Sequence, residues 1–348
     1  MANLPALPLI GGALFIDNSG WMEGMNTCYR YLQFRNLNLR VSTGEKPALN
    51  FGSAIHMALE LRYSLYGNKP VDQRYYDDVA TILTEFFDQH PPPSEDWRTL
   101  NWAMETIKRY NGRYEQEEFN LLRYVTPIDC PHCIGGPENC LWCRGSGKRE
   151  YLVELPFSIP LYTHKGIPII YSGRIDLPIM WQGDLWSMDT KTTGQLGDMF
   201  WNEQRISAQH RGYCWALRKL GHQAKGYIVN AIRSKEPPQY VMNGAPWKGR
   251  QQTPAMWWNE SLLRDRQYLQ ENELEVWERN TVDLCEEFFW HYERDYMPMK
   301  TKWCSSYGKC PYYDVCKMVP SEQPALLASG FFTPNVWTPL AQPTQSKQ

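Results

Sequence analysis

The sequence predicts a mixed α/β fold with a central mixed sheet flanked by helices. Amphipathic helical patterns dominate residues 53–124, and strand-like runs then cluster between residues 151 and 232 around one further helix. The chain has 348 residues, 43% of them hydrophobic, which is enough to bury one large core. We therefore expect one enclosing α/β domain that carries inserted segments.

Helices are expected before the sheet. Residues 1–50 form an irregular opening, after which Ser53 is placed to cap a helix that ends near Tyr66. The buried stripe of this helix would consist of Ile55, Leu59 and Tyr63. Helices at 71–90 and 94–124 follow, separated by three consecutive prolines that interrupt helical hydrogen bonding.

The remaining elements alternate between strand and helix. Strands are expected at 151–159, 167–181, 184–190 and 225–232, with a helix at 199–220 and a long helix at about 260–296. These patterns predict the following parts: an N-terminal and helical part (1–129), an inserted cysteine-rich module (130–147), a core (148–233), a loop (234–256), the long helix with a cysteine run (257–318), and a flexible tail (319–348).

Composition restricts the class of protein. The net charge of −2 excludes a strong overall attraction for nucleic acid, so any such surface would be local. No apolar run approaches the roughly 18 to 20 residues of a spanning helix, and no leader peptide is recognisable, so we expect no membrane association and a location in the cytoplasm of a bacterial or phage-infected cell. In such a reducing compartment the ten cysteines are better explained as metal ligands than as disulfides.

One predicted hairpin carries chemistry. If its turn is centred on Gln182-Gly183, Asp176 lies opposite Asp189 on one face, and Lys191 shares that face because side chains alternate along a strand. Two carboxylates and an ammonium suit a hard cation such as Mg²⁺ that activates water beside a phosphate. The alternative is an ordinary cross-strand ion pair between Asp176 and Lys191.

A second pattern indicates zinc. Two CxxC pairs close together favour a four-thiolate zinc site formed by Cys130, Cys133, Cys140 and Cys143. His132, inside the first pair, is a substitute ligand, although four cysteines already complete a tetrahedron. The neighbouring Lys148 and Arg149 leave open whether this knuckle contacts DNA, contacts a partner protein or only caps the insert.

Four ordered motifs resemble the PD-(D/E)xK nuclease superfamily, in particular its RecB-like or AddB-like branch with CRISPR-associated iron-sulfur exonucleases. They are Phe51-Gly52-Ser53-Ala54-Ile55-His56 for GxxxH, Gly173-Arg174-Ile175-Asp176 for GxxD, Asp189-Thr190-Lys191-Thr192 for DxKT, and Gln209-His210-Arg211-Gly212-Tyr213 for QxxxY. The resemblance runs from Cys28 to Cys316, excludes the 130–147 insert, and implies a restriction-endonuclease-like fold.

The resemblance also implies the roles of individual residues. His56, Asp176, Asp189 and the Thr190 carbonyl would bind one or two Mg²⁺ or Mn²⁺ ions, and Lys191 would be the catalytic lysine. Gln209 and Tyr213, one helical turn apart, would position the scissile strand. Glu60 and Glu154 are candidate accessory acids, although solvated or structural charges are the favoured interpretation of both.

The same resemblance implies an iron-sulfur cluster. Cys304, Cys310 and Cys316 supply three thiolates, and Cys28 occupies the place of the fourth, upstream of the GxxxH motif, to hold a 4Fe-4S cluster. The family's Cys-Pro-Arg is replaced here by Cys28-Tyr29-Arg30, which leaves zinc or plain buried thiols as alternatives. Cys214 and Cys285 lie in helical patterns and are expected to be buried thiols.

The sequence thus predicts a metal-dependent deoxyribonuclease, an exonuclease acting on single-stranded DNA or DNA ends in recombination, repair or phage DNA processing. A basic bias near the QxxxY motif suits a phosphate-tracking groove, and it comprises Arg205, His210, Arg211, Arg218, Lys219 and Lys225. No P-loop is present, so unwinding would require a helicase or recombination partner. The alternative is a catalytically inactive DNA-binding or assembly subunit with structural metal sites.

Overall fold

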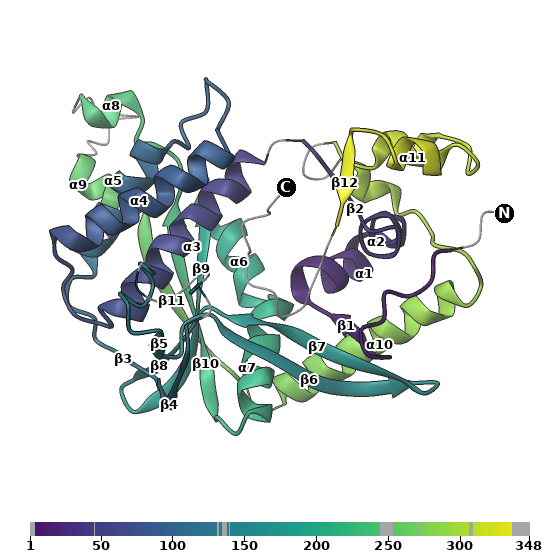
Figure 1. Ribbon diagram of the computed structural model, residues 1–348, viewed down its shortest axis with the longest axis horizontal. Coiled ribbons are helices and arrows are strands. Elements are labelled where there is room, and N and C mark those ends of the chain that lie inside the picture. The colour runs from purple at the N-terminus through teal and green to yellow at the C-terminus, as the bar shows by residue number, and fades with distance from the viewer. Residues whose placement is uncertain are drawn as a thin grey trace. The chain divides into compact units, whose positions relative to one another are not determined.

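The computed structural model describes residues 4–44, 46–130, 132–133, 138, 140–243, 253–270, 272–305 and 309–335. The chain divides into two compact units (Figure 1). Unit 1 comprises residues 1–44, 156–174 and 271–348, and unit 2 comprises residues 45–155 and 175–270.

Unit 2 is built on a five-stranded sheet with the order β11–β10–β9–β8–β3. The interior strand β9 pairs in parallel with β10 and antiparallel with β8. Strands β4 and β5 form a separate two-stranded sheet. The strands are β3 (Asn120–Leu121), β4 (Arg123–Asp129), β5 (Lys148–Tyr151), β8 (Leu177–Trp181), β9 (Asp184–Thr193), β10 (Ala224–Arg233) and β11 (Leu262–Tyr268).

Helices pack on this sheet (Figure 1). The helices are α3 (Pro47–Leu65), α4 (Gln73–Gln89), α5 (Leu100–Arg113), α6 (Asp198–Arg205), α7 (Ala208–Lys219), α8 (Gln239–Met242) and α9 (Pro254–Asn259). Asp72 and Thr99 cap α4 and α5 by accepting hydrogen bonds from backbone N–H groups of the first turn. The apolar faces of α3, α4 and α5 join the sheet in one core.

Unit 1 contains a three-stranded sheet of order β1–β7–β6 and a two-stranded sheet that pairs β2 with β12. Its strands are β1 (Leu14–Ile16), β2 (Arg40–Ser42), β6 (Leu155–His164), β7 (Ile167–Ile175) and β12 (Phe332–Pro334). Its helices are η1 (Asn18–Met22), α1 (Glu23–Thr27), α2 (Tyr29–Leu32), η2 (Gln33–Leu37), α10 (Glu273–Tyr292), η3 (Thr301–Cys304), α11 (Tyr313–Lys317) and α12 (Gln323–Leu327). No helix in the described part of the chain is long and apolar enough to cross a membrane.

The predicted α/β class and the register of the central hairpin are confirmed. Leu177 pairs with Met188 and Trp181 with Asp184, as a turn centred on Gln182-Gly183 requires. Both turn residues have positive φ, 53° and 85°, which is the conformation of a two-residue turn that matches strand twist. The expected stripe of Ile55, Leu59 and Tyr63 is buried.

Several expected elements are wrong in their bounds. α3 begins at Pro47, a favoured first helical residue, so Ser53 lies within the helix. The expected strand at 167–181 is divided at Asp176 between β7 and β8, and the expected helix at 199–220 is divided at Ile206-Ser207. The strand expected at 151–159 is interrupted before β6, where Glu154 has a φ of +52°.

Tertiary contacts explain two larger errors. The helix expected at 94–124 ends at Arg113, because the Arg62 guanidinium bonds the Tyr114 carbonyl at 2.6 Å and binds the buried Glu117. The long helix expected at 260–296 is wrong in its first part, since residues 262–268 form β11 along the edge of β10. Completing a sheet edge here outweighs helical propensity.

The chain ends also differ from expectation. The N-terminal 50 residues are not irregular, because short helical turns and two strands occupy much of them. The expected tail at 319–348 contains α12 and β12, and residues 336–348 lie outside the described residues. The expected loop at 234–256 contains α8 and the start of α9, and its residues 244–252 also lie outside the described part.

Candidate functional site

The close approach of α3 to β9 builds one side of the candidate site in unit 2. Gly52 allows this approach, because a Cβ on it would lie 2.9 Å from the Thr192 hydroxyl. One turn further along α3, the His56 Nδ1 lies 3.4 Å from Asp176 Oδ2, and its Nε2 lies 2.9 Å from the Thr190 carbonyl oxygen. The GxxxH pattern therefore places its histidine at the Asp176 end of the hairpin.

Three residues form a group suited to a metal ion. Each of His56, Glu154 and Asp176 offers one ligand atom, and these atoms lie within 4.8 Å of one another. The Glu154 N–H donates to the Asp176 carbonyl oxygen at 2.9 Å. Glu154 is a non-glycine residue in the left-handed region, a costly conformation that occurs preferentially at functional sites. Glu154 therefore lies close enough to His56 and Asp176 to act as an accessory acid, a role that no sequence motif marks.

Asp189 lies on the face of β9 that α7 covers. Its side chain is almost completely buried, with Lys191 Nζ 2.7 Å from Oδ2 and the ring Nδ1 of His210 3.8 Å from the same oxygen. Its Oδ1 is buried without a hydrogen-bond partner among the described residues. A buried carboxylate oxygen without a donor suits a cation.

The two aspartates influence each other's protonation. Burial and the neighbouring Asp189 raise the pKa of Asp176 to about 6. Burial is the largest influence on Asp189 and opposes its ionisation, but Lys191 together with His210 and His56 outweighs burial and lowers the pKa of Asp189. Burial would also lower the pKa of Lys191, yet Asp189 and Asp176 raise it. Lys191 is therefore protonated at neutral pH.

A chain of hydrogen bonds joins Lys191 to α7. Lys191 Nζ donates to Gln209 Oε1 at 2.8 Å, and Gln209 Nε2 donates to the Tyr213 hydroxyl at 2.8 Å. The four-residue spacing puts both α7 side chains on one helical face. Gln209 and Tyr213 therefore lie with Lys191, where the sequence expected them.

Thr190 connects the hairpin to a buried polar network. Its N–H donates to Asp176 Oδ2 at 2.9 Å, and its hydroxyl accepts a bond of 3.0 Å from Asn230 Nδ2. Arg264 Nε donates to Asn230 Oδ1 at 3.2 Å. Its Nη1 donates to Glu117 Oε2 at 2.7 Å and its Nη2 to Glu117 Oε1 at 2.9 Å. Asn230, Arg264 and Glu117 were not identified from the sequence, because no motif marks residues that act through packing.

The donor set around Asp176 fits a hard divalent cation. Glu154 and Asp176 contribute two carboxylates and His56 one imidazole, and the Asp189 carboxylate lies near enough to raise the pKa of Asp176. Carboxylate oxygens are the ligands that Mg²⁺ prefers. Lys191 supplies one ammonium, so the group retains excess negative charge that a cation would compensate.

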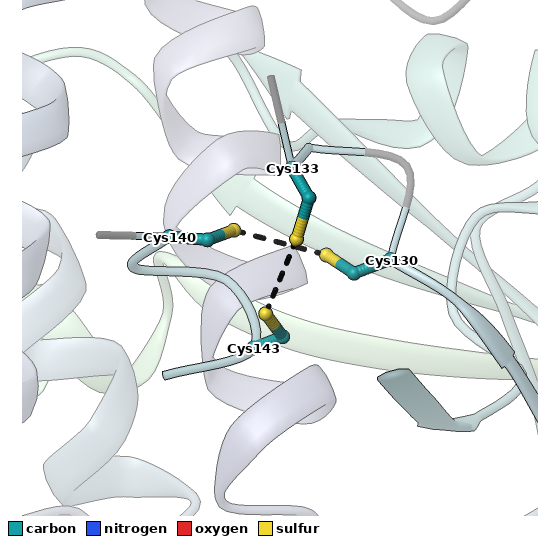
Figure 2. Close-up of side chains that lie close together, drawn as sticks. All are labelled: Cys130, Cys133, Cys140 and Cys143. Carbon is teal, nitrogen blue, oxygen red and sulfur yellow. Dashed lines mark hydrogen bonds between the residues drawn. The ribbon is translucent and has the colours of Figure 1, made fainter. Parts of the chain in front are cut away.

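Four sulfurs converge in the insert (Figure 2). Cys130, Cys133, Cys140 and Cys143 form a group whose sulfurs lie within 4.8 Å of one another. The Sγ–Sγ separations are 3.8 Å for Cys130–Cys140 and 3.4 Å for Cys133–Cys143. Zinc–sulfur bonds of ~2.3 Å in a tetrahedron give sulfurs about 3.8 Å apart. This geometry is compatible with a zinc-knuckle insert.

The other four metal-site candidates lie in unit 1. Burial and the nearby thiols of Cys28, Cys310 and Cys304 raise the pKa of Cys316 to about 12, so these cysteines are close enough to influence one another. Cys310 and Cys316 pack against an aromatic cluster that includes Phe34 and Tyr312. These four do not form a group with three sulfurs within 4.8 Å in the part of the chain that the structure describes. Cys214 and Cys285 are buried, as expected.

The basic bias expected near α7 needs one correction. His210 is fully buried against Tyr227, and burial lowers its pKa to about 4, so it adds no positive charge at neutral pH. Its Nε2 lies 3.0 Å from Gln204 Oε1, so it is a neutral residue behind Asp189. Arg205, Lys219 and Lys225 are exposed.

Comparison with known protein families identifies the superfamily. The family model described as PD-(D/E)XK nuclease superfamily matches residues 22–317. A search of curated proteins gave no match. The matched segment contains His56, Glu154, Asp176, Asp189 and Lys191, and it covers most of the chain. The chain therefore belongs to the PD-(D/E)XK nuclease superfamily.

Proposed function

We propose that this protein is a Mg²⁺- or Mn²⁺-dependent deoxyribonuclease of the RecB-like branch, an exonuclease that hydrolyses single-stranded DNA or DNA ends. The observation that carries the proposal is the meeting of two groups at one hairpin: His56, Glu154 and Asp176 on one side, and Asp189 with Lys191 on the other. This arrangement offers ligands for a cation and a fixed ammonium for phosphate.

The residues divide the chemistry between them. His56, Glu154, Asp176, Asp189 and the Thr190 carbonyl would hold the ion. When bound, it would supply positive charge beside the scissile phosphate and lower the pKa of water. Lys191, held by Asp189 and Gln209, presents its positive charge to the non-bridging phosphate oxygens and orients the attacking water. As the water oxygen bonds to phosphorus it loses a proton to solvent, the opposite P–O ester bond breaks, and the departing oxygen takes up a proton from solvent.

Surfaces beside the hairpin support a single-stranded substrate. α6 follows β9, and none of its side chains is buried; Met199 is 89% exposed, and Phe200 and Trp201 are partly exposed. Such side chains can stack on unpaired bases. A cavity of about 350 Å³ is lined by the Gly194–Gly197 loop together with Arg233, Lys235 and Glu236. Its two basic side chains outnumber its one carboxylate, which suits a backbone phosphate.

The cysteines support two further cofactors. We assign zinc to Cys130, Cys133, Cys140 and Cys143 because their sulfurs already have the spacing of a tetrahedral site. We assign a 4Fe-4S cluster to Cys28, Cys304, Cys310 and Cys316. Their order along the chain resembles that of the iron-sulfur branch, and Cys28, Cys304 and Cys310 lie close enough to Cys316 to influence its pKa.

Digestion of end-labelled DNA tests the proposal. Purified protein with Mg²⁺ or Mn²⁺ is given linear single-stranded, linear double-stranded, end-blocked and circular substrates side by side. We expect linear single strands to be shortened from an end, and Lys191→Ala to reduce the rate by about 10²-fold or more. Lys108→Ala, an exposed lysine on α5 outside the basic bias near α7, is the matched control.

Each other outcome has a defined meaning. Cutting of circular DNA would overturn exonuclease action while retaining the nuclease. If the wild type cuts no substrate with either metal, the enzyme proposal fails and the chain is an inactive DNA-binding or assembly subunit of the same fold. A helicase or recombination partner would be tested by whether its addition extends digestion to double-stranded ends.

A further inference from the structure

The zinc-knuckle insert contacts the helix that carries His56. His132 lies between the first two cysteines of the knuckle, and its ring stacks on Trp142, between the other two, at 4.1 Å and 16°. His132 Nε2 lies 3.0 Å from Glu60 Oε1. Because Glu60 follows His56 by one turn of α3, the knuckle reaches the same face of the helix as the candidate metal ligand.

Arg149, at the base of the insert on β5, joins three segments. Its Nη2 donates to Glu60 and, at 3.0 Å, to Ser64 Oγ, while its Nη1 donates to the Val153 carbonyl oxygen at 3.2 Å. The side chain is 4% exposed, so these bonds are shielded from water. Val153 directly precedes Glu154, so one guanidinium connects α3 to the backbone that presents a second candidate ligand.

A third contact anchors the far side of the knuckle. Arg144, the residue after Cys143, has a φ of +48° in the turn that the cysteines form. Its Nη2 donates to Asp78 Oδ2 on α4 at 2.9 Å and to the Tyr66 hydroxyl at the end of α3. The insert is thus attached to α3 at two positions and to α4 at one, through side chains next to or between cysteines.

We propose that the zinc knuckle is a positioning element: when its four thiolates bind zinc, His132 and Arg149 hold α3 and residues 152–154 in the arrangement that brings His56 and Glu154 to the catalytic ion. This inference rests on the proposed function, which supplies the catalytic ion. Zinc fixes the loop in which the His132 ring lies, and Glu60 transmits that geometry to α3. Binding of zinc and binding of the catalytic ion are then coupled, and each strengthens the other.

Mn²⁺ affinity, measured by the EPR signal of the free ion without DNA, tests the coupling. Residues that orient metal ligands typically alter metal affinity 10- to 100-fold. We expect Arg149→Ala and Glu60→Gln each to weaken Mn²⁺ binding by about tenfold, with Arg149→Lys restoring part of it. In cleavage assays these variants should need more Mn²⁺ to reach half-maximal activity, but their kcat at saturating Mn²⁺ should be nearly normal. Zinc removed by a chelator, or by Cys140→Ser, should have the same effect.

Lys148→Ala is the matched control, because Lys148 neighbours Arg149 on β5 but pairs with the exposed Asp129. It should leave Mn²⁺ affinity unchanged. If Arg149→Ala has no cooperative melting transition, it is not folded, and the positioning role is then tested by the Mn²⁺ affinity of Glu60→Gln alone. Unchanged Mn²⁺ affinity in Glu60→Gln, or a change only in DNA binding, would overturn the positioning role. A wild type that binds no Mn²⁺ would instead overturn the proposed catalytic site.

Discussion

Lys191 Nζ lies 2.8 Å from Gln209 Oε1, so the Lys191 ammonium contacts both the uncharged Gln209 amide on α7 and the Asp189 carboxylate. The other end of the amide is fixed by Tyr213. Gln209 thereby orients the lysine without removing its charge. The position of the Lys191 ammonium therefore depends on α7 as well as on β9, the strand that carries it.

We expect Gln209→Leu to lower kcat by about 10- to 100-fold, because the ammonium loses one of two anchors. Tyr213→Phe should have a smaller effect in the same direction, since only the amide orientation is loosened. Single-turnover cleavage at saturating Mn²⁺ measures both. Gln204→Leu on α6 is unsuitable as a control because Gln204 bonds His210, whereas the exposed Glu203→Gln is suitable. Full activity in Gln209→Leu would contradict the role.

Glu154 should contribute to metal binding although no motif marks it. Replacing it with Gln retains its size but removes its charge from the group formed with His56 and Asp176. We expect Mn²⁺ affinity to fall by about tenfold or more, measured by titration calorimetry. The neighbouring Glu150→Gln, an exposed carboxylate paired with Arg123, is the control. Equal affinity in Glu154→Gln and the wild type would exclude Glu154 from the site.

Metal binding should weaken in acid. The pKa of Asp176 is raised from 3.8 to about 6, so below pH 6 the metal must displace a proton from this carboxyl. We expect the apparent Mn²⁺ affinity to fall by up to about tenfold per pH unit between pH 6 and pH 5 and to level off above pH 7. Calorimetric titrations at several pH values would show this, and a constant affinity from pH 5 to pH 8 would contradict it.

Asp176 should also cost stability in the metal-free protein. A carboxyl whose pKa is raised on folding destabilises the folded state at pH values above its unfolded pKa, and the cost is complete above about pH 6. Asp176→Asn should therefore increase the unfolding free energy of the metal-free protein at pH 7.5 by on the order of 1 kcal/mol, and its Tm should rise accordingly. The same substitution should abolish the stabilisation that Mn²⁺ gives the wild type. Thermal melts with and without Mn²⁺ measure both effects.

In unit 1, His164 should stabilise the fold mainly at low pH. Its ring stacks on Phe289 at 3.9 Å, and its nitrogens lie 2.9 Å from Glu286 and 3.1 Å from Glu293. Burial opposes its charge, but the two glutamates raise its pKa above 6.5. The stabilisation is therefore complete below pH 6.5 and is lost as the pH rises through the higher folded-state value. The destabilisation by His164→Gln should be about 1 kcal/mol larger at pH 5.5 than at pH 8.5, measured by urea unfolding.

Cys28→Ala should release the proposed iron-sulfur cluster. We expect the broad visible absorbance to disappear and unfolding free energy to fall by up to about 5 kcal/mol, because the cluster closes a very long loop. Cys140→Ser should retain the colour and lose one zinc ion. A colourless wild type with two zinc ions per chain after anaerobic purification would contradict the cluster.

The sequence was most informative where a local pattern decides the geometry. Alternation and a two-residue turn were sufficient to predict the register of β8 and β9, and the four-residue spacing placed Gln209 and Tyr213 on one face. Glu154 and the Asn230 network were not predictable in this way, because their roles arise from contacts between segments far apart in the chain.

By itself, the sequence determined the α/β class, the hairpin with its Asp189 and Lys191 face, and the pairing of two CxxC turns into one cluster, since each follows from backbone periodicity or short spacing. Only the tertiary structure showed where the strands and helices are interrupted and that His210 is buried and neutral. It also showed that the knuckle contacts α3 through His132 and Glu60. Burial and long-range pairing set those features, and neither is encoded within a short stretch of residues.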